Sequence, residues 1–168
     1  METVMERQTY RQQPVFFDCP VTVPYLIPVI HSTSPYCINV LFMVDGEAYY
    51  VTSFSLQKPY GVVITEKNID DMDISLPGMA LSTHPLFPLG ADIVFVEVER
   101  KDLLKVRLYG KDQGELDFSE QGASAAFIAA RMMQKTLLPG ANVAMGGKNC
   151  RVEWDGAFGK VKVTGINN

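Results

Sequence analysis

Apolar and polar residues alternate along much of this chain, and that pattern predicts β-strands. The clearest example is residues 38–56, where two apolar runs flank Asp45-Gly46, a dipeptide that favours the type I′ turn of a β-hairpin. The same reasoning predicts strands over residues 61–65, 91–99 and 103–109, a short extended stretch over 114–118, and a second hairpin over 150–166. The pattern therefore predicts a mainly β protein.

A helical period appears over residues 119–138, where Asp117 or Ser119 can cap the start and Pro139-Gly140 ends the run. Small apolar residues should form one face of this helix, and that face could pack closely on a sheet or on a second helix. The polar face is predicted to contain Glu120, Ser124, Arg131, Gln134 and Lys135.

Two segments near the N-terminus differ from this pattern. Residues 1–13 are polar and are expected to form a flexible arm. Residues 15–31 are apolar but interrupted by prolines, which cannot donate to a strand ladder, so an edge strand or extended chain is expected there.

The stretch from Asp73 to Gly78 is predicted to be a short strand that meets a ligand. On an extended backbone the side chains of Asp73 and Ser75 project from the same face, with acceptor oxygens and a hydroxyl that suit a polar ring. Gly78 would let the backbone approach that ring without a Cβ in the way.

The Asp-x-Ser-x-x-Gly spacing of Asp73, Ser75 and Gly78, followed by Leu89-Gly90, resembles the PilZ domain, a receptor module for cyclic di-GMP. The second motif of that family, Arg-x-x-x-Arg, is matched by Arg7 and Arg11. In this chain 73 − 11 = 62 positions separate the two motifs, against a couple of dozen in the family, so an insertion is implied.

The resemblance implies an antiparallel PilZ-like β-barrel with one helix at about 119–138 and an extra hairpin or insertion. It divides the chain into the arm of residues 1–13 and one domain over residues 14–168. Whether the helix is an insertion or the C-terminal helix of the barrel stays open. The helix is expected to close the barrel, and a homodimer is left possible.

The resemblance also implies a function. Arg7 and Arg11 would hold guanine and phosphate of cyclic di-GMP, Asp73 and Ser75 would bind the guanine edge, and Gly78 would leave room for the base. The arm would become ordered on binding, and a downstream protein partner would read that change to control motility, adhesion or polysaccharide production. The alternative is a protein-interaction module on the same barrel that binds no nucleotide.

Composition limits the other classes. A net charge of −4 argues against nonspecific nucleic-acid binding, and no apolar run approaches membrane-spanning length. Three scattered cysteines form no metal or disulfide pattern, which fits a reducing cytoplasm, and the N-terminus lacks the apolar run of a signal peptide. No catalytic motif is recognised, so neither an enzyme nor a cofactor is expected.

Overall fold

The computed structural model describes residues 14–19, 37–157 and 159–166, which form one ten-stranded sheet with two α-helices and a 3-10 turn. The strand order across the sheet is β1-β10-β9-β8-β6-β5-β4-β3-β2, with β7 paired to β6. The strands are β1 (Val15–Cys19), β2 (Cys37–Val44), β3 (Glu47–Ser55), β4 (Pro59–Thr65), β5 (Asp92–Arg100), β6 (Leu103–Gly110), β7 (Gly114–Leu116), β8 (Gly140–Met145), β9 (Lys148–Glu153) and β10 (Gly159–Ile166).

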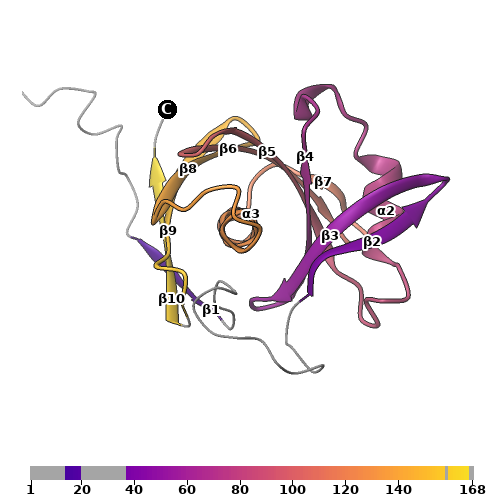
Figure 1. Cartoon of the computed structure of the whole chain (residues 1–168), viewed down its shortest axis with the longest axis horizontal. Coiled ribbons are helices and arrows are strands. Elements are labelled where there is room, and N and C mark those ends of the chain that lie inside the picture. Colours follow the sequence, from indigo (N-terminus) through magenta and orange to yellow (C-terminus); the bar gives the residue numbers. More distant parts are fainter. Residues whose placement is uncertain (1–13, 20–36, 158, 167–168) are drawn as a thin grey trace, which may run out of the picture.

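The sheet is mixed, and it curves around the helix α3 (Glu120–Met132), which runs through its concave side (Figure 1). Pairs β4–β5 and β6–β8 are parallel, and the other pairs are antiparallel. The chain crosses over through the helix α2 (Ser75–Ser82) in the first case and through α3 in the second. The prediction of an antiparallel PilZ-like barrel with one helix is therefore wrong.

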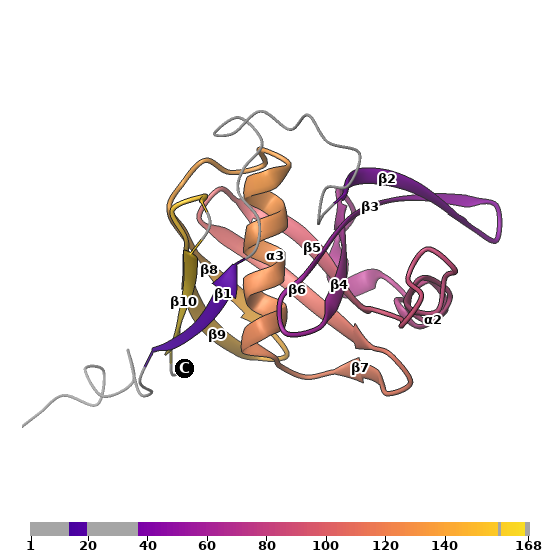
Figure 2. The ribbon, with the colours of Figure 1, turned by 90° about the horizontal axis from the view of Figure 1, so that it is seen from below.

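Both predicted hairpins are confirmed. Asp45 and Gly46 have φ values of 49° and 80°, as a type I′ turn between β2 and β3 requires. Strands β9 and β10 pair antiparallel from Asn149↔Ile166 to Glu153↔Lys162. The β2–β3 hairpin projects beyond the part of the sheet that surrounds α3 (Figure 2).

Helix α3 is buried on every side from Gly122 to Met132. Ser119 is its N-cap, since the hydroxyl accepts a hydrogen bond from the Gly122 N–H at 3.0 Å. The predicted solvent-facing side is wrong, because Ser124 is 0% exposed and Arg131 is 5% exposed. The helix also ends earlier than predicted, at Met132, and Gln134 follows it with a φ of 58°.

The segment predicted as a ligand-binding strand is a turn and a helix. Asp73 Oδ1 accepts a hydrogen bond from the Ser75 N–H at 3.0 Å, and Ser75 begins α2. Gly78 lies inside this helix, where a Cβ would stand 2.5 Å from Cγ of Tyr109 on β6. Its small size serves the contact between α2 and the sheet rather than a turn, and the strand prediction is wrong.

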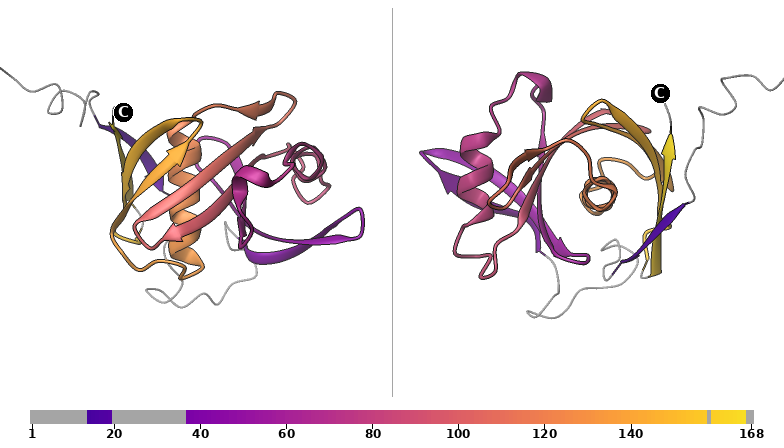
Figure 3. Two further views of the ribbon diagram at one scale, coloured as in Figure 1. Left: turned by 90° about the horizontal axis from the view of Figure 1, so that it is seen from above. Right: turned by 180° about the vertical axis from the view of Figure 1, so that it is seen from behind.

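Two apolar clusters lie on opposite faces of the sheet. The larger one surrounds α3, and the smaller one lies under α2 and the β2–β3 hairpin. The views from above and behind show α3 and α2 on opposite sides of the sheet (Figure 3). The buried Arg131 side chain contacts the segment after β9. Its Nη1 donates to the Trp154 carbonyl at 2.8 Å. Among the described residues no helix is long and apolar enough to span a membrane.

Candidate functional site

The first turn of α3 carries backbone hydrogen-bond donors that suit a small charged molecule. The backbone N–H groups of Glu120 and Gln121 have no acceptor within the helix, because the first residues of any α-helix lack one. The helix dipole adds partial positive charge at the same point. Ser119 to Gln121 are half-buried, so this turn is reached from solvent beside the core.

The β3–β4 turn lies directly against this helix start. The Gln57 N–H donates to Gln121 Oε1 at 2.9 Å, and Gln121 Nε2 donates to Gln57 Oε1 at 3.1 Å. These two hydrogen bonds join residues 64 positions apart in the chain. The β3–β4 turn at Gln57 and the start of α3 at Ser119 to Gln121 therefore form one surface, joined by these two side-chain amides. We call this surface the wall at α3.

Tyr60 brings an unpaired hydroxyl to the same place. Its side chain is 0% exposed, and the hydroxyl has no hydrogen-bond partner among the described residues. Burial raises the pKa of Tyr60 well above its usual value and the Asp92 carboxylate raises it further, while the nearby Ser119 side chain acts in the opposite direction. Tyr60 is therefore a neutral phenol at physiological pH, and its hydroxyl points to the N-cap of α3.

Asp92 ties the charged groups of this wall together. Its carboxylate is 2.6 Å from Lys58 Nζ, and it accepts a hydrogen bond from the Lys111 N–H at 2.9 Å. Asp92 itself is buried, whereas the Lys58 side chain is half exposed. The helix N–H groups suit a carboxylate, and the Glu120 carboxylate suits an ammonium group.

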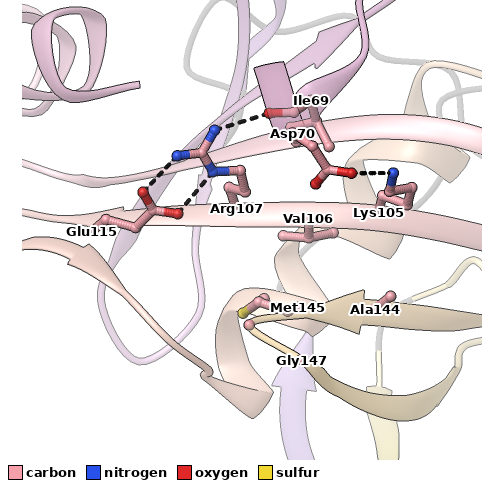
Figure 4. A pocket seen from close by; sticks show the side chains of 10 residues that line it. Ile69, Asp70, Lys105, Val106, Arg107, Glu115, Ala144, Met145 and Gly147 are labelled. Atoms are coloured by element: carbon pink, nitrogen blue, oxygen red, sulfur yellow. Dashed lines mark hydrogen bonds and ion pairs between the residues drawn. The ribbon is translucent and has the colours of Figure 1, made fainter. Parts of the chain in front are cut away.

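A pocket of about 290 Å³ lies on the opposite, outer face of the sheet, among β6, β7, the 3-10 turn η1 (Ile69–Asp71) and the β8–β9 turn (Figure 4). Its charged groups are already paired. Arg107 donates to both oxygens of Glu115 at 2.8 and 2.6 Å, and Lys105 Nζ is 2.6 Å from Asp70.

Arg107 also donates through Nη1 to the Ile69 and Met72 carbonyls, at 2.9 and 2.6 Å. The pKa of Arg107 is raised, chiefly by its hydrogen bond to Glu115, so the guanidinium stays charged. Each charge in this pocket has a partner from the chain. We therefore infer that these interactions stabilise the packing of η1 and β7 against β6.

A wider hollow of about 560 Å³ lies between the tip of the β2–β3 hairpin and residues 67–73. Its ionisable side chains are mostly acidic, and it is lined by Glu47, Tyr49, Lys67, Asn68, Asp71, Met72 and Asp73. Burial raises the pKa of Tyr49, and the Glu47 carboxylate adds to the increase. Within the described residues, no group of three or more histidine, cysteine, aspartate or glutamate side chains could hold a metal ion.

The residues predicted to bind a ligand do not converge on the wall at α3. Asp73 lines the acidic hollow, Ser75 begins α2, and Gly78 is buried under Tyr109. Arg7 and Arg11 lie outside the described residues. Among the residues at the α3 wall, the sequence identified only the capping role of Ser119.

The Cys150 thiol is not activated for chemistry by its surroundings. Cys150 is 0% exposed, and burial raises the pKa of its thiol to about 12, with Glu120 adding to the increase. A thiol of that pKa is neutral near pH 7 and is a poor nucleophile or base. Cys19 is buried, and Cys37 lies 2.7 Å from the Ser53 hydroxyl.

Comparison with known proteins identifies enzymes as relatives. The chain is 28% identical over 146 residues to the diaminopimelate epimerase of Leptospira biflexa, covering 87% of this chain and 51% of that enzyme. It is 31% identical over 122 residues to the diaminopimelate epimerase of a Cyanothece species, covering 73% of this chain and 43% of that enzyme. The chain thus spans about half the length of the curated relatives it matches. No family model matches.

Among solved structures, a phenazine biosynthesis PhzC/PhzF protein from Clostridium difficile aligns with a TM-score of 0.44 and 17% identity, over 62% of this chain and 39% of that chain. The sequence relatives overturn the PilZ resemblance and the predictions that followed from it. Cyclic di-GMP as ligand, signalling as function and a non-enzyme are all corrected, because the relatives are epimerases that act on a small molecule.

Proposed function

We propose that this chain takes part in inverting the stereocentre of an amino acid of the diaminopimelate type, as an isomerase. The observation that carries the proposal is similarity to diaminopimelate epimerases over most of the chain: 28% identity over 87% of it and 29% identity over 84% of it in two examples.

The wall at α3 suits such a substrate. An α-amino acid at neutral pH carries a carboxylate and an ammonium group on one carbon. The N–H groups of Glu120 and Gln121 can hold the carboxylate, and the Glu120 carboxylate can hold the ammonium. The buried hydroxyl of Tyr60 and the Ser119 hydroxyl lie beside the same turn.

Epimerisation removes a proton from one face of a carbon and returns a proton to the other, so it needs an acid or base on each face. The wall offers hydroxyl donors and the Glu120 carboxylate. The neutral phenol of Tyr60 and the protonated thiol of Cys150 cannot remove a proton near pH 7. In this proposal the wall binds and orients the amino acid, and it supplies groups to one face of the reacting carbon.

A second candidate follows from the same observation. The described residues at the wall hold no thiol of lowered pKa and no histidine, and a chain that binds the amino acid without converting it would need neither. This candidate is an amino-acid-binding protein whose chain resembles part of an epimerase.

The deciding experiment measures exchange of the substrate's α-proton. The chain is incubated in D₂O with one stereoisomer of diaminopimelate, and loss of the α-proton signal and formation of the other stereoisomer are followed by NMR. Turnover supports the isomerase. Binding detected by calorimetry without exchange supports the binding protein, and neither binding nor exchange would contradict both candidates.

Variants place the activity at the wall. We expect Ser119→Ala and Tyr60→Phe to weaken binding or exchange, because each removes a hydroxyl beside the start of α3. Ser75→Ala and Tyr49→Phe remove the same groups elsewhere and should leave both signals unchanged. Equal effects of the two sets would show that the wall is not the site.

A further inference from the structure

The hydroxyl of Tyr60 is a buried polar group with no hydrogen-bond partner among the described residues. Three buried side-chain polar atoms of the described chain lack a hydrogen bond, and two of them belong to Tyr60 and Asp92. These two residues are partners in the β4–β5 register, so they lie side by side in the sheet. Native proteins leave few buried polar atoms unpaired, and a functional role is one explanation for the exceptions.

Tyr60 is too deeply buried to touch a ligand itself. Its side chain is 0% exposed, and Lys58 Nζ lies 6.0 Å from the centre of its ring. The neighbouring Asp92 carboxylate is compensated by the chain, since Oδ2 is 2.6 Å from Lys58 Nζ and the Lys111 N–H donates to Oδ1 at 2.9 Å.

The other polar side chain that acts on Tyr60 is Ser119, the N-cap of α3. Burial and the Asp92 carboxylate raise the pKa of Tyr60, and the Ser119 side chain acts in the opposite direction, which places the two hydroxyls close together. Tyr60 also belongs to the apolar cluster that surrounds α3. Any effect of the phenol on a ligand at the wall at α3 therefore passes through Ser119.

We propose that Tyr60 is a positioning residue, which makes the Ser119 hydroxyl a hydrogen-bond donor to the carboxylate of a bound amino acid. A serine oxygen can accept two hydrogen bonds and donate one. Ser119 Oγ already accepts from the Gly122 N–H at 3.0 Å, which leaves one acceptor position. When the phenol donates to that position, the Ser119 hydrogen points away from Tyr60, toward the start of α3. This inference rests on the proposed function.

Ligand binding and the hydrogen bond between the two hydroxyls are coupled in this scheme. Hydrogen bonds of active sites are often long or poorly aligned without ligand and tighten when the ligand binds. A carboxylate at the start of α3 draws the Ser119 hydrogen outward, and the freed lone pair of Oγ then accepts from Tyr60. The buried phenol thus contributes to binding without contacting the ligand.

A positioning role predicts opposite effects of Tyr60→Phe on stability and on binding. An unpaired buried hydroxyl destabilises a fold, so its removal should leave the urea midpoint of the chain without ligand unchanged or raise it. The same variant should weaken binding of diaminopimelate, measured by calorimetry, by about threefold or more. A purely structural residue would lower both. Tyr49→Phe, which removes a phenol hydroxyl from the hairpin, is the matched control and should bind normally.

A cycle of variants tests whether the effect passes through Ser119. Tyr60→Phe should weaken binding by the same factor in the natural chain and in Ser119→Thr, which keeps the hydroxyl and the N-cap. In Ser119→Ala it should have no further effect, because no hydroxyl is left to orient. Losses that multiply in the double variant Tyr60→Phe with Ser119→Ala would contradict the coupling.

Affinity and stability together separate this inference from the proposed function. A natural chain that binds no diaminopimelate overturns both. When the natural chain binds it and Tyr60→Phe binds equally well, only the positioning role fails. A Tyr60→Phe variant that is both less stable and weaker in binding also overturns the positioning role and leaves the proposed function standing.

Discussion

Arg107 and Arg131 show how single residues connect distant parts of this fold. Arg131, on α3, donates to the Trp154 carbonyl and lies 5.6 Å from the Trp154 ring, which ties the central helix to the segment after β9. Arg107, on β6, bonds to Glu115 and to two carbonyls near η1. In both cases the guanidinium donates hydrogen bonds to backbone carbonyls of segments that are not paired in the sheet.

Replacing Arg107 by methionine should lower the free energy of unfolding by about 2 kcal/mol or more, because charge-assisted hydrogen bonds to Glu115 and to the carbonyls of Ile69 and Met72 are lost together. Urea unfolding measures this change. The control is Arg100→Met, which breaks a bond to Asp102 between side chains that are 66% and 55% exposed, and should cost little. Equal losses of unfolding free energy in the two variants would show that the Arg107 interactions stabilise the fold no more than an exposed ion pair does.

Cys150 makes stability depend on alkaline pH. Its pKa is raised from 9.0 to about 12, so between these values the unfolded chain loses the thiol proton while the folded chain keeps it. Stability from this group is complete below pH 9 and falls as pH rises, by at most about 1.4 kcal/mol per pH unit. Thermal or urea unfolding across that range should show a shallower decline for Cys150→Val than for the natural chain, and parallel curves would contradict this account.

At the scale of elements, α2 shows how packing overrides a local pattern. Ser75 to Ser82 includes Pro77 and Gly78, which suggest a turn in an isolated sequence. Proline fits the first turn of a helix, where its missing N–H is not needed. Gly78 then allows the helix backbone to lie against Tyr109.

Gly78→Ala tests this contact. Alanine normally stabilises a helix relative to glycine by up to about 1 kcal/mol. Here its Cβ would stand 2.5 Å from Tyr109 Cγ and 2.8 Å from Tyr109 Cβ, atoms too near the β6 backbone to move freely. We expect a net loss of about 1–3 kcal/mol in unfolding free energy. Combined with Tyr109→Ala, the substitution should cost much less, and strict additivity would show that the two residues do not collide.

At the scale of the whole molecule, the curved sheet encloses α3 so fully that the helix has no solvent-facing side from Gly122 to Met132. Its alanines are explained by this enclosure, because small side chains let strands approach from several directions. The hydroxyl of Ser124, which would suggest a polar face, instead bonds back to the Glu120 carbonyl at 3.0 Å.

Because α3 is enclosed on every side, we expect larger side chains to lower the stability of the fold on all faces of the helix. A helix with one solvent-facing side would instead tolerate them at regular intervals. Residues two apart on a helix project about 200° from one another. Ser124→Leu and Ala126→Leu should nevertheless each reduce the unfolding free energy, by about 1–3 kcal/mol, since both sites are 0% exposed. Ala48→Leu, on the exposed part of the hairpin, should be nearly neutral. Tolerance of leucine at either α3 position would contradict full enclosure.

Short-range features of this protein were predictable from sequence. The Asp45-Gly46 turn, the two hairpins and the Ser119 cap depend on residues within a few positions of each other, and the structure confirms them. The candidate wall was not predictable, apart from the role of Ser119 as a cap. Tyr60 carries no sequence signal, and it reaches α3 because β4 pairs parallel with β5 in the middle of the sheet.

The sequence by itself thus determined which segments form most strands and where the long helix begins, because alternation, turn dipeptides and caps act locally. Only the tertiary structure decided that the sheet is mixed, that α3 is its centre and that Asp73 to Gly78 is a turn and a helix. The physical reason is that parallel crossovers and helix burial depend on contacts between residues tens of positions apart, which no local pattern records.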